Sequence, residues 1–591
     1  MARRGLRILF TLIGAFFVLT LTGLFLLYLA LGREPTVPSN AVLRLRIGGD
    51  LAEVAPADVL GYLRGVRTPT VQSIVENLRK AKADPRVSAV LLEPTGFSTP
   101  FWGKIQELRD AVLDFKKSGK PIYAYLEYGG DRDYYLASAA TKVFLMPSSP
   151  LDLTGVATYA VFLRGSFDKI GMVPDIHHIG DYKTAANQFT EKTYTPAHRE
   201  MDASLNRDLF DQMVRGIAEA RRKTDDEVRA LFDAGPFLPE DALRVGLIDD
   251  VAYQDQVMEK LRDVRPGAAM RTIESDAYSR VSPGSLGLNS GPRMAVIYAT
   301  GAIAGGKSGF DPLNGAAVGS DTLTEYIRQA RRDSSIRAII LRVDSPGGSA
   351  TASDAIWREL TIARNERADR PIVASMSDLA ASGGYYIAMA AQSIVAQPST
   401  LTGSIGIFGG KFVTGGVYRK LGANIESTSI GKRAEMNSPV RPYNPDELTK
   451  VREQLQSFYD DFVEKVAQSR NSTPEKIDLL AQGRVWTGHQ AKQNGLVDEL
   501  GGLDRAIVIA KQQAKIDPDA EVELVTFPPH KSFYELLSEE LSGVSQSAAI
   551  DAWIADRFSA GELELMRAVR GPYAMFRRGE ALALMPFTFV R

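Results

Sequence analysis

Residues 74–94, IVENLRKAKADPRVSAVLLEP, recur in a similar form at residues 323–343 as LTEYIRQARRDSSIRAIILRV. In both copies a charged segment with apolar residues at helical spacing leads into a short apolar run, AVLL (89–92) or AIILRV (338–343). This pattern predicts a helix followed by a buried strand. Continuous apolar strands that alternate with helices are typical of a parallel sheet covered on both faces. We therefore predict an α/β fold.

The similarity extends well beyond this stretch. GKPIYAYLEYGGDRDYYLASAATKVFLMPSS (119–149) resembles DRPIVASMSDLAASGGYYIAMAAQSIVAQPST (369–400), and DALRVGLIDDV (241–251) resembles QAKQNGLVDEL (490–500). The separation stays near 249–251 residues throughout. A fixed separation of this kind indicates internal repetition. The chain is therefore predicted to contain a tandem duplication of one βα domain.

At 591 residues the chain is too long for one ordinary hydrophobic core. The repeat and the composition divide it into six predicted segments. These are a cytoplasmic tail (1–7), a transmembrane anchor (8–32), a linker (33–40), an N-terminal repeat domain (41–292), a C-terminal repeat domain (293–530) and a C-terminal extension (531–591).

The predicted anchor, ILFTLIGAFFVLTLTGLFLLYLALG (8–32), has 25 residues and no charge. At about 1.5 Å per residue such a helix is long enough for a hydrocarbon core of roughly 30 Å. Three arginines precede it, whereas Arg33 and Glu34 cancel just after it. The positive-inside rule then predicts a single-pass protein whose large body lies on the extracytoplasmic side.

The composition excludes several classes of site. The net charge of −1 gives no reason to expect a nucleic-acid partner. The absence of cysteine excludes disulfides, Cys-ligated zinc and thiol nucleophiles.

The two repeats differ at two positions that could carry chemistry. When the repeats are aligned on their Tyr-Tyr pairs, Ser382 falls opposite Asp131, and at the same separation Lys183 falls opposite Ala434. One half therefore keeps a candidate nucleophile and the other a candidate base, which predicts one composite site between them. A serine needs an adjacent base, and a lysine can serve only when it is neutral. Lys432 is the alternative base, since it lies two residues from the Ala434 position and in the same half as Ser382.

Four ordered motifs, LRVDSPGGSATASD (341–354), ASGGYYIAMAA (381–391), TLTGSIGIFGG (400–410) and IGDYKTAANQFT (179–190), resemble the signal peptide peptidase A family in its long, tandem-domain form. The resemblance covers roughly 500 residues. It implies a fold like the Clp protease proteolytic subunit and the crotonases, and a serine/lysine dyad shared between the two domains. It also implies a bowl-shaped homotetramer that opens toward the bacterial inner (cytoplasmic) membrane, with the catalytic body on the periplasmic side.

The resemblance assigns roles to individual residues. It implies that Ser382 is the nucleophile and Lys183 the general base. It implies that Ser404 orients the lysine. The glycines that it implies as contributors of backbone N–H groups to an oxyanion hole are Gly347, Gly348 and Gly383. The implied activity is that of a membrane-anchored serine endopeptidase that degrades cleaved signal peptides and similar hydrophobic peptides. No cofactor and no metal are implied.

Two other functions compete with this interpretation. A catalytically inactive membrane scaffold could keep the fold, although it would have no need for both Ser382 and Lys183. A thioester-acting enzyme of the crotonase type would have no need for a membrane anchor. GAIAGGKS (301–308) also satisfies a phosphate-loop pattern, but the Gly, Pro and Asn residues after it exclude the helix that such a loop must enter.

Overall fold

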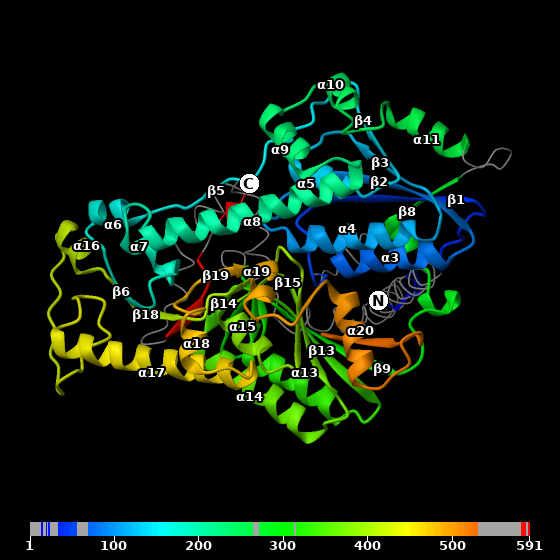
Figure 1. Cartoon of the computed structure of the whole chain (residues 1–591). Coiled ribbons are helices and arrows are strands. Elements are labelled where there is room, and N and C mark those ends of the chain that lie inside the picture. Colours follow the sequence, from blue (N-terminus) through cyan, green and yellow to red (C-terminus); the bar gives the residue numbers. More distant parts are fainter. Residues whose placement is uncertain are drawn as a thin grey trace, which may run out of the picture.

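The computed structural model describes residues 34–55, 69–263, 271–311, 315–529 and 581–586, together with single positions near both ends of the chain. In Figure 1 the first half, coloured from blue through cyan to green, lies against the second half, coloured from green through yellow to orange. Both halves alternate strands with helices, so the predicted α/β fold class is confirmed.

The predicted anchor, residues 8–32, falls almost wholly outside the described residues. Within the described part of the chain, no helix combines the length and the apolar character needed to cross a bilayer. The predicted extension, residues 531–591, is described at residues 581–586 and at two later positions.

Within the described residues, the first half contains a six-stranded parallel sheet with the order β7-β4-β3-β2-β1-β8. Its strands are β1 (Ala41–Gly49), β2 (Val87–Phe97), β3 (Ile122–Leu126), β4 (Lys142–Leu145), β7 (Asp250–Val251) and β8 (Arg271–Glu274). Helix α3 (Val71–Ala83) begins at a capping box between Thr70 and Ser73 and buries the apolar residues that recur at helical spacing.

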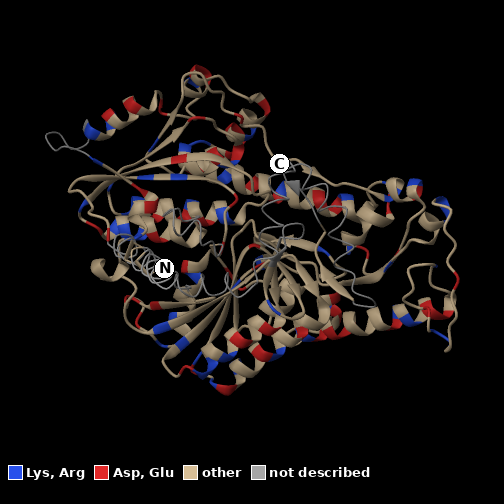
Figure 2. Cartoon of the chain, turned by 180° about the vertical axis from the view of Figure 1, so that it is seen from behind, with Lys and Arg blue, Asp and Glu red and all other residues tan. Residues whose placement is uncertain are grey.

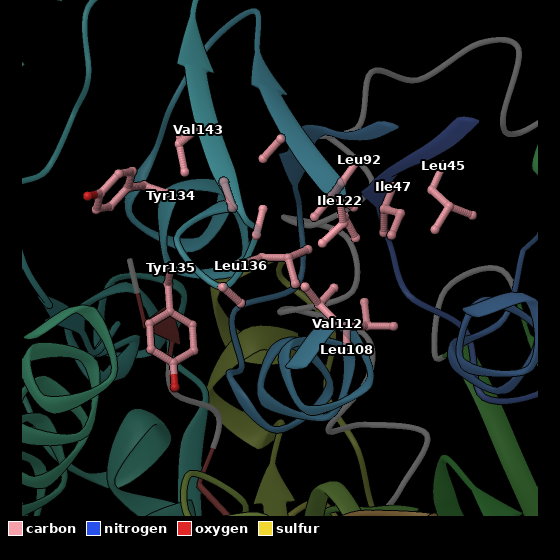
Figure 3. Close-up of a cluster of buried hydrophobic side chains, with 14 of the residues drawn as sticks. Leu45, Ile47, Leu92, Leu108, Val112, Ile122, Tyr134, Tyr135, Leu136 and Val143 are labelled. Carbon is pink, nitrogen blue, oxygen red and sulfur yellow. The ribbon is translucent and has the colours of Figure 1, made fainter. Parts of the chain in front are cut away.

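The core of this half forms between the sheet and helices α4 (Gly103–Lys116) and α5 (Asp131–Ala137). Figure 3 shows Leu108 and Val112 of α4 pointing toward Ile122 of β3 and Leu136 of α5. All four side chains are buried. The apolar residues of the strands and those that recur at helical spacing therefore pack together in one core layer, as the sequence pattern predicts.

The second half repeats this arrangement in its own sheet, which within the described residues has the order β19-β17-β15-β13-β9-β21. In addition, β16 pairs with β15, and β20 pairs with β16. The strands are β9 (Arg293–Thr300), β13 (Ile336–Ser345), β15 (Ile372–Ala381), β16 (Ser393–Ala396), β17 (Leu401–Gly403), β19 (Val485–Thr487), β20 (Glu499–Leu500) and β21 (Glu523–Phe527). The helices include α13 (Ser320–Arg332), α14 (Ala350–Glu366), α15 (Gly383–Ala388) and α20 (Leu503–Gln513).

Equivalent elements of the two halves keep the spacing of the sequence repeat. Helices α3 and α13 begin at Val71 and Ser320, which are 249 residues apart (320 minus 71). The long helices α8 (Pro196–Arg221) and α17 (Pro445–Ser469) show the same separation of 249 (445 minus 196). The duplication seen in the sequence is therefore a duplication of the fold.

A third sheet joins the halves. Its order within the described residues is β11-β12-β10-β14-β22-β18-β6, and its strands are β6 (Val173–Ile179), β10 (Ala302–Ala304), β11 (Gly309–Asp311), β12 (Gly315–Gly319), β14 (Gly347–Ser349), β18 (Ile407–Val413) and β22 (Leu582–Leu584). Strand β6 of the first half pairs antiparallel with β18 of the second. Strand β22, drawn in red, comes from the far end of the chain and lies between β14 and β18 (Figure 1).

Charged residues of both signs are interspersed along the helices, as Figure 2 shows from behind. One group of buried charges lies where the two halves meet: the guanidinium of Arg342 on β13 contacts Glu53 at 2.8 Å and Glu107 at 2.6 Å, both from the first half. These buried ion pairs fix the two halves against each other.

The phosphate-loop pattern at residues 301–308 takes the structure that the sequence predicts. The segment contains β10 and then turns into β11, and the next helix in the described part of the chain, α13, begins only at Ser320. A phosphate-binding loop must lead straight into a helix. This segment therefore lacks the geometry of such a loop.

Candidate active site

Ser382 lies at the sharp turn where β15 ends and α15 begins. Its backbone has φ 54° and ψ −112°, which is rare for a residue that carries a side chain. The Ser382 N–H donates to the Gly403 carbonyl at 2.8 Å, and this bond holds the turn. Within the described residues the hydroxyl makes no capping hydrogen bond to α15. The strained turn therefore leaves Oγ available to another partner, and strain of this kind is typical of functional sites.

That partner is Lys183, which comes from the other half of the chain. It follows β6 and precedes a short 3-10 turn, η1 (Thr184–Ala186). The Lys183 Nζ lies 2.7 Å from Ser382 Oγ, and it lies 3.0 Å from both the carbonyl oxygen and the Oγ of Ser404. All three residues are fully buried. The structure therefore brings together the serine and the lysine that the repeat alignment selected.

Burial sets the protonation of Lys183. It lowers the pKa of the amine well below the ordinary lysine value, and among the described residues no carboxylate acts to raise it again. A neutral amine has two N–H donors and one lone pair. The three neighbouring oxygen atoms match these groups. Nζ can donate its two N–H groups to the two Ser404 oxygens, and its lone pair can accept a hydrogen bond from the Ser382 hydroxyl.

Glycines allow the lysine to sit so close to the second half. Gly483 has φ +80°, and a Cβ built on it would lie 2.4 Å from the Lys183 Cα. Gly180 has φ +93°, and its Cβ would lie 2.4 Å from the carbonyl carbon of Gln482. The Tyr182 N–H also donates to the Gln482 carbonyl at 2.9 Å. Two facing glycine turns therefore fix the position of the Lys183 backbone.

Ser404 occupies the turn between β17 and β18, with φ 48°. Its N–H donates to the Arg484 carbonyl at 2.7 Å, so its backbone is tied to the segment that follows Gly483, the glycine packed against Lys183. Both oxygens of Ser404 face the amine. The residue can therefore hold the amine in one orientation.

The predicted glycines lie beside the serine. Gly347 and Gly348 form most of β14, with φ +101° and +153°. A Cβ on Gly347 would lie 2.7 Å from the Gly383 nitrogen, so the two backbones are in close contact. The Gly347 N–H donates to Ser345 Oγ at 3.2 Å. The structure thus gathers all three predicted glycines around the turn that carries Ser382.

Lys432, the alternative base, lies elsewhere. Its side chain is 73% exposed, and its Nζ pairs with Asp446 at 2.9 Å. Lys432 is therefore close to the aligned position of Lys183 in the sequence, but it does not lie at the site in the structure.

Sequence reasoning missed a buried ion cluster beneath the site. Lys104 of α4 reaches the second half, where its Nζ lies 2.7 Å from Asp344 and 3.5 Å from Asp378. Asp344 also accepts the Leu379 N–H at 3.2 Å. These carboxylates stand three residues before Gly347 and four before Ser382, so Lys104 ties together the two strand ends that carry the site. Lys104 belongs to a charged helical segment, and nothing in that pattern marks it as buried.

Comparison with known proteins gives consistent results. Peptidase family S49 matches the chain twice, at residues 114–266 and 364–517. The chloroplastic serine protease SPPA of Arabidopsis thaliana is 39% identical over 85% of this chain and 73% of its own length. Protease 4 of Salmonella typhi is 35% identical over 75% of this chain and 72% of its own length. A putative signal peptide peptidase SppA of Enterococcus faecium is 34% identical over 33% of this chain and 57% of its own length.

Among solved structures, a mutant of ClpP1 from Listeria monocytogenes covers 35% of this chain and 92% of its own length at 14% identity, with a TM-score of 0.23. A likeness at this level carries no argument about the fold. The predicted relation to the Clp protease and crotonase folds therefore stays a prediction.

Proposed function

Because this chain belongs to peptidase family S49 and is a serine endopeptidase, we propose that Ser382 is its nucleophile and Lys183 its general base. The observation that carries the proposal is the 2.7 Å contact between Lys183 Nζ and Ser382 Oγ in a fully buried setting. A serine hydroxyl becomes an effective nucleophile when an adjacent base takes its proton, and a lysine freed of its charge can be that base.

The proposed reaction has two halves. In the first, the Ser382 Oγ attacks the substrate carbonyl carbon while its proton passes to Lys183 Nζ, and a tetrahedral oxyanion forms. The C–N bond then breaks as Lys183 returns this proton to the leaving amine, which gives an acyl-enzyme and the first product. In the second half, Lys183 takes a proton from water, the resulting hydroxyl attacks the ester, and the proton returns to Ser382 as the second product leaves.

The neighbours of the pair have supporting roles in this proposal. Ser404 positions the Lys183 amine through its carbonyl and its hydroxyl. Gly347, Gly348 and Gly383 supply the backbone around the developing oxyanion, where one good donor contributes roughly 3–4 kcal/mol. Glycine suits these positions because a Cβ on Gly347 or Gly348 would collide with neighbouring backbone.

The proposed substrates are cleaved signal peptides and similar hydrophobic peptides, and we place the enzyme in the bacterial inner membrane with its body on the extracytoplasmic side. The name of the Enterococcus faecium relative and the uncharged run at residues 8–32 support this proposal. A homotetramer is the proposed assembly, on the strength of the family resemblance. No cofactor takes part in the proposed chemistry.

The decisive experiment measures hydrolysis of a fluorogenic apolar peptide by the detergent-solubilised full chain. Ser382→Ala and Lys183→Met should each lower kcat/KM by roughly 10³-fold or more, because each removes a member of a pair that acts as a unit. Lys432→Met is the matched control and should keep wild-type activity, since its amine is exposed and paired with Asp446. Normal cleavage by a folded Lys183→Met protein would refute the assignment of the base.

A further inference from the structure

The C-terminal strand β22 lies at the candidate site, although about two hundred residues separate it from Ser382 in sequence. It pairs antiparallel with β14, with Gly347 opposite Leu584, Gly348 opposite Ala583 and Ser349 opposite Leu582. Two further bonds extend this pairing: the Ala350 N–H donates to the Ala581 carbonyl at 3.2 Å, and the Met585 N–H donates to the Pro346 carbonyl at 2.8 Å.

The strand passes directly beside the proposed oxyanion position. A Cβ on Gly347 would lie 2.0 Å from the Ala583 carbonyl oxygen, and a Cβ on Gly383 would lie 3.2 Å from the same atom. The Ala583 carbonyl oxygen therefore lies close to Gly347 and to Gly383, the residue that follows Ser382. A substrate carbonyl held by the N–H groups of these glycines would occupy the same place.

The side chains of the strand are buried in apolar surroundings drawn from both halves. Leu582 and Leu584 join a cluster with Phe189 of the first half and Phe408 and Phe412 of the second. Met585 joins another cluster, which contains Met201, Leu205, Leu379 and Leu401. Ala583 is fully buried. An extended apolar peptide with a small residue at its centre is therefore already accommodated at the site.

With this strand in place, the reactive groups are closed off from solvent. Ser382 and Lys183 both have 0% exposure. A peptide substrate cannot contact Ser382 Oγ until some covering segment moves. Strand β22 is the segment whose backbone fills the position beside Gly347 and Gly348, and one edge of β14 can pair with only one strand at a time.

We propose that residues 581–586 are a built-in competitor that occupies the position of the substrate strand and must leave before an apolar peptide can bind. This inference rests on the proposed function, because it takes Ser382 as the nucleophile. The competitor belongs to the same chain, so dilution of the protein does not remove it. A substrate peptide gains access when it displaces the strand from β14, a case of recognition by strand addition.

The absence of cysteine from the chain allows a reversible test. The double variant Ser349→Cys/Leu582→Cys places two thiols at paired positions of the antiparallel ladder. This pair neighbours the hydrogen-bonded pair of Ala350 and Ala581, so it is a non-hydrogen-bonded pair with a short Cα–Cα distance of about 4.5 Å, which suits a disulfide. Oxidation should lock the strand onto β14, and a thiol reductant should free it again.

The expected result is a drop in kcat/KM of tenfold or more on oxidation of the full chain, with recovery on reduction. The single variants Ser349→Cys and Leu582→Cys are the controls and should not respond in this way. In a Ser382→Ala background, the same double variant should bind a fluorescein-labelled apolar peptide only when reduced. If the disulfide does not form, or if it forms and leaves both cleavage and peptide binding unchanged, the proposal is wrong.

The readouts separate this proposal from the proposed function. Disulfide yield and peptide binding in the Ser382→Ala background report on the strand without any need for catalysis. If Ser382→Ala cleaves as well as wild type, the assignment of the nucleophile fails, while redox-gated peptide binding would still support the competitor strand. If Ser382 proves essential but the oxidised variant cleaves normally, the competitor strand fails alone.

Discussion

Lys183 Nζ contacts Ser382 Oγ at 2.7 Å across 199 residues of sequence, and each residue comes from a different copy of a duplicated fold. The contact depends on two strands from the two halves, since β6 delivers the lysine and β18, which follows Ser404, pairs with β6 along its whole length. Each half alone therefore lacks one member of the pair.

The first prediction concerns the pH dependence of activity. Burial lowers the pKa of Lys183 well below 10.5, and the amine must be neutral to accept the serine proton. Activity should therefore rise with pH through the pKa of the buried lysine, with an acid limb of kcat/KM well below pH 10.5. A series of kcat/KM measurements from about pH 5 to 10 checks this. An acid limb centred at the ordinary lysine pKa would contradict a buried lysine as the base.

The second prediction separates the hydroxyl of Ser404 from its backbone. Both Ser404→Ala and Ser404→Gly remove the oxygen that lies 3.0 Å from Lys183 Nζ, but only glycine adopts the positive φ of 48° without strain. If the hydroxyl orients the amine, both variants should lose roughly 10- to 100-fold in kcat, in keeping with the loss of a positioning group. Steady-state kinetics on the two variants provides the check. Recovery of full activity in Ser404→Gly would assign the effect to backbone strain instead.

The repeat alignment explains how much of this site the sequence could predict. Ser382 and Lys183 stood out because each lacks a counterpart in the other repeat, and the structure brings them together. Their catalytic roles stay predictions until the variants are measured. The parallel strands were predictable for a similar reason, since apolar runs such as residues 338–343 follow helical patterns at the same place in both copies.

Two features at the site could not be predicted from the local sequence pattern. Lys104 lies in a helix that also carries exposed and half-buried charges, and its burial depends on Asp344 and Asp378 of the other half. Strand β22 is a short apolar run, and its partner β14 lies more than two hundred residues earlier. Pairing over such distances depends on the folded surface, and the periodicity of a short segment carries no information about it.

The third prediction tests the close approach of Gly483 to the lysine. In Gly483→Ala the new Cβ would lie 2.4 Å from the backbone N and Cα of Lys183, so the lysine must shift and its amine must leave Ser382. We expect a loss of roughly 100-fold or more in kcat/KM, as displacements near 1 Å can cost this much. Gly495→Ala is the matched control: it has a similar φ of +87° but no atom within 4 Å of the new Cβ. Equal losses in both variants, measured with the same peptide, would show that backbone strain rather than displacement is responsible.

The last prediction concerns the free energy of unfolding and the direction in which it changes with pH. Burial raises the pKa of Asp344 to about 6 even though Lys104 opposes that rise, so Lys104→Met should raise it further and leave buried carboxylates without their partner. The folded variant then holds a proton on Asp344 at pH values where the unfolded chain has released it, so its stability falls as pH rises through this window. We expect Lys104→Met to lower the free energy of unfolding by about 3–5 kcal/mol near pH 8 and by clearly less near pH 5.

Urea unfolding of wild type and variant at the two pH values measures this difference. Lys82→Met is the matched control, because Lys82 pairs with Asp114 at the similar distance of 2.8 Å on the surface, where the two side chains are 35% and 49% exposed. An exposed pair of this kind contributes about 0–1 kcal/mol. A Lys104→Met protein as stable as the Lys82→Met control at pH 8, or one that loses more stability at pH 5, would refute the assignment of Lys104 as the buried link between the strand ends that carry Gly347 and Ser382.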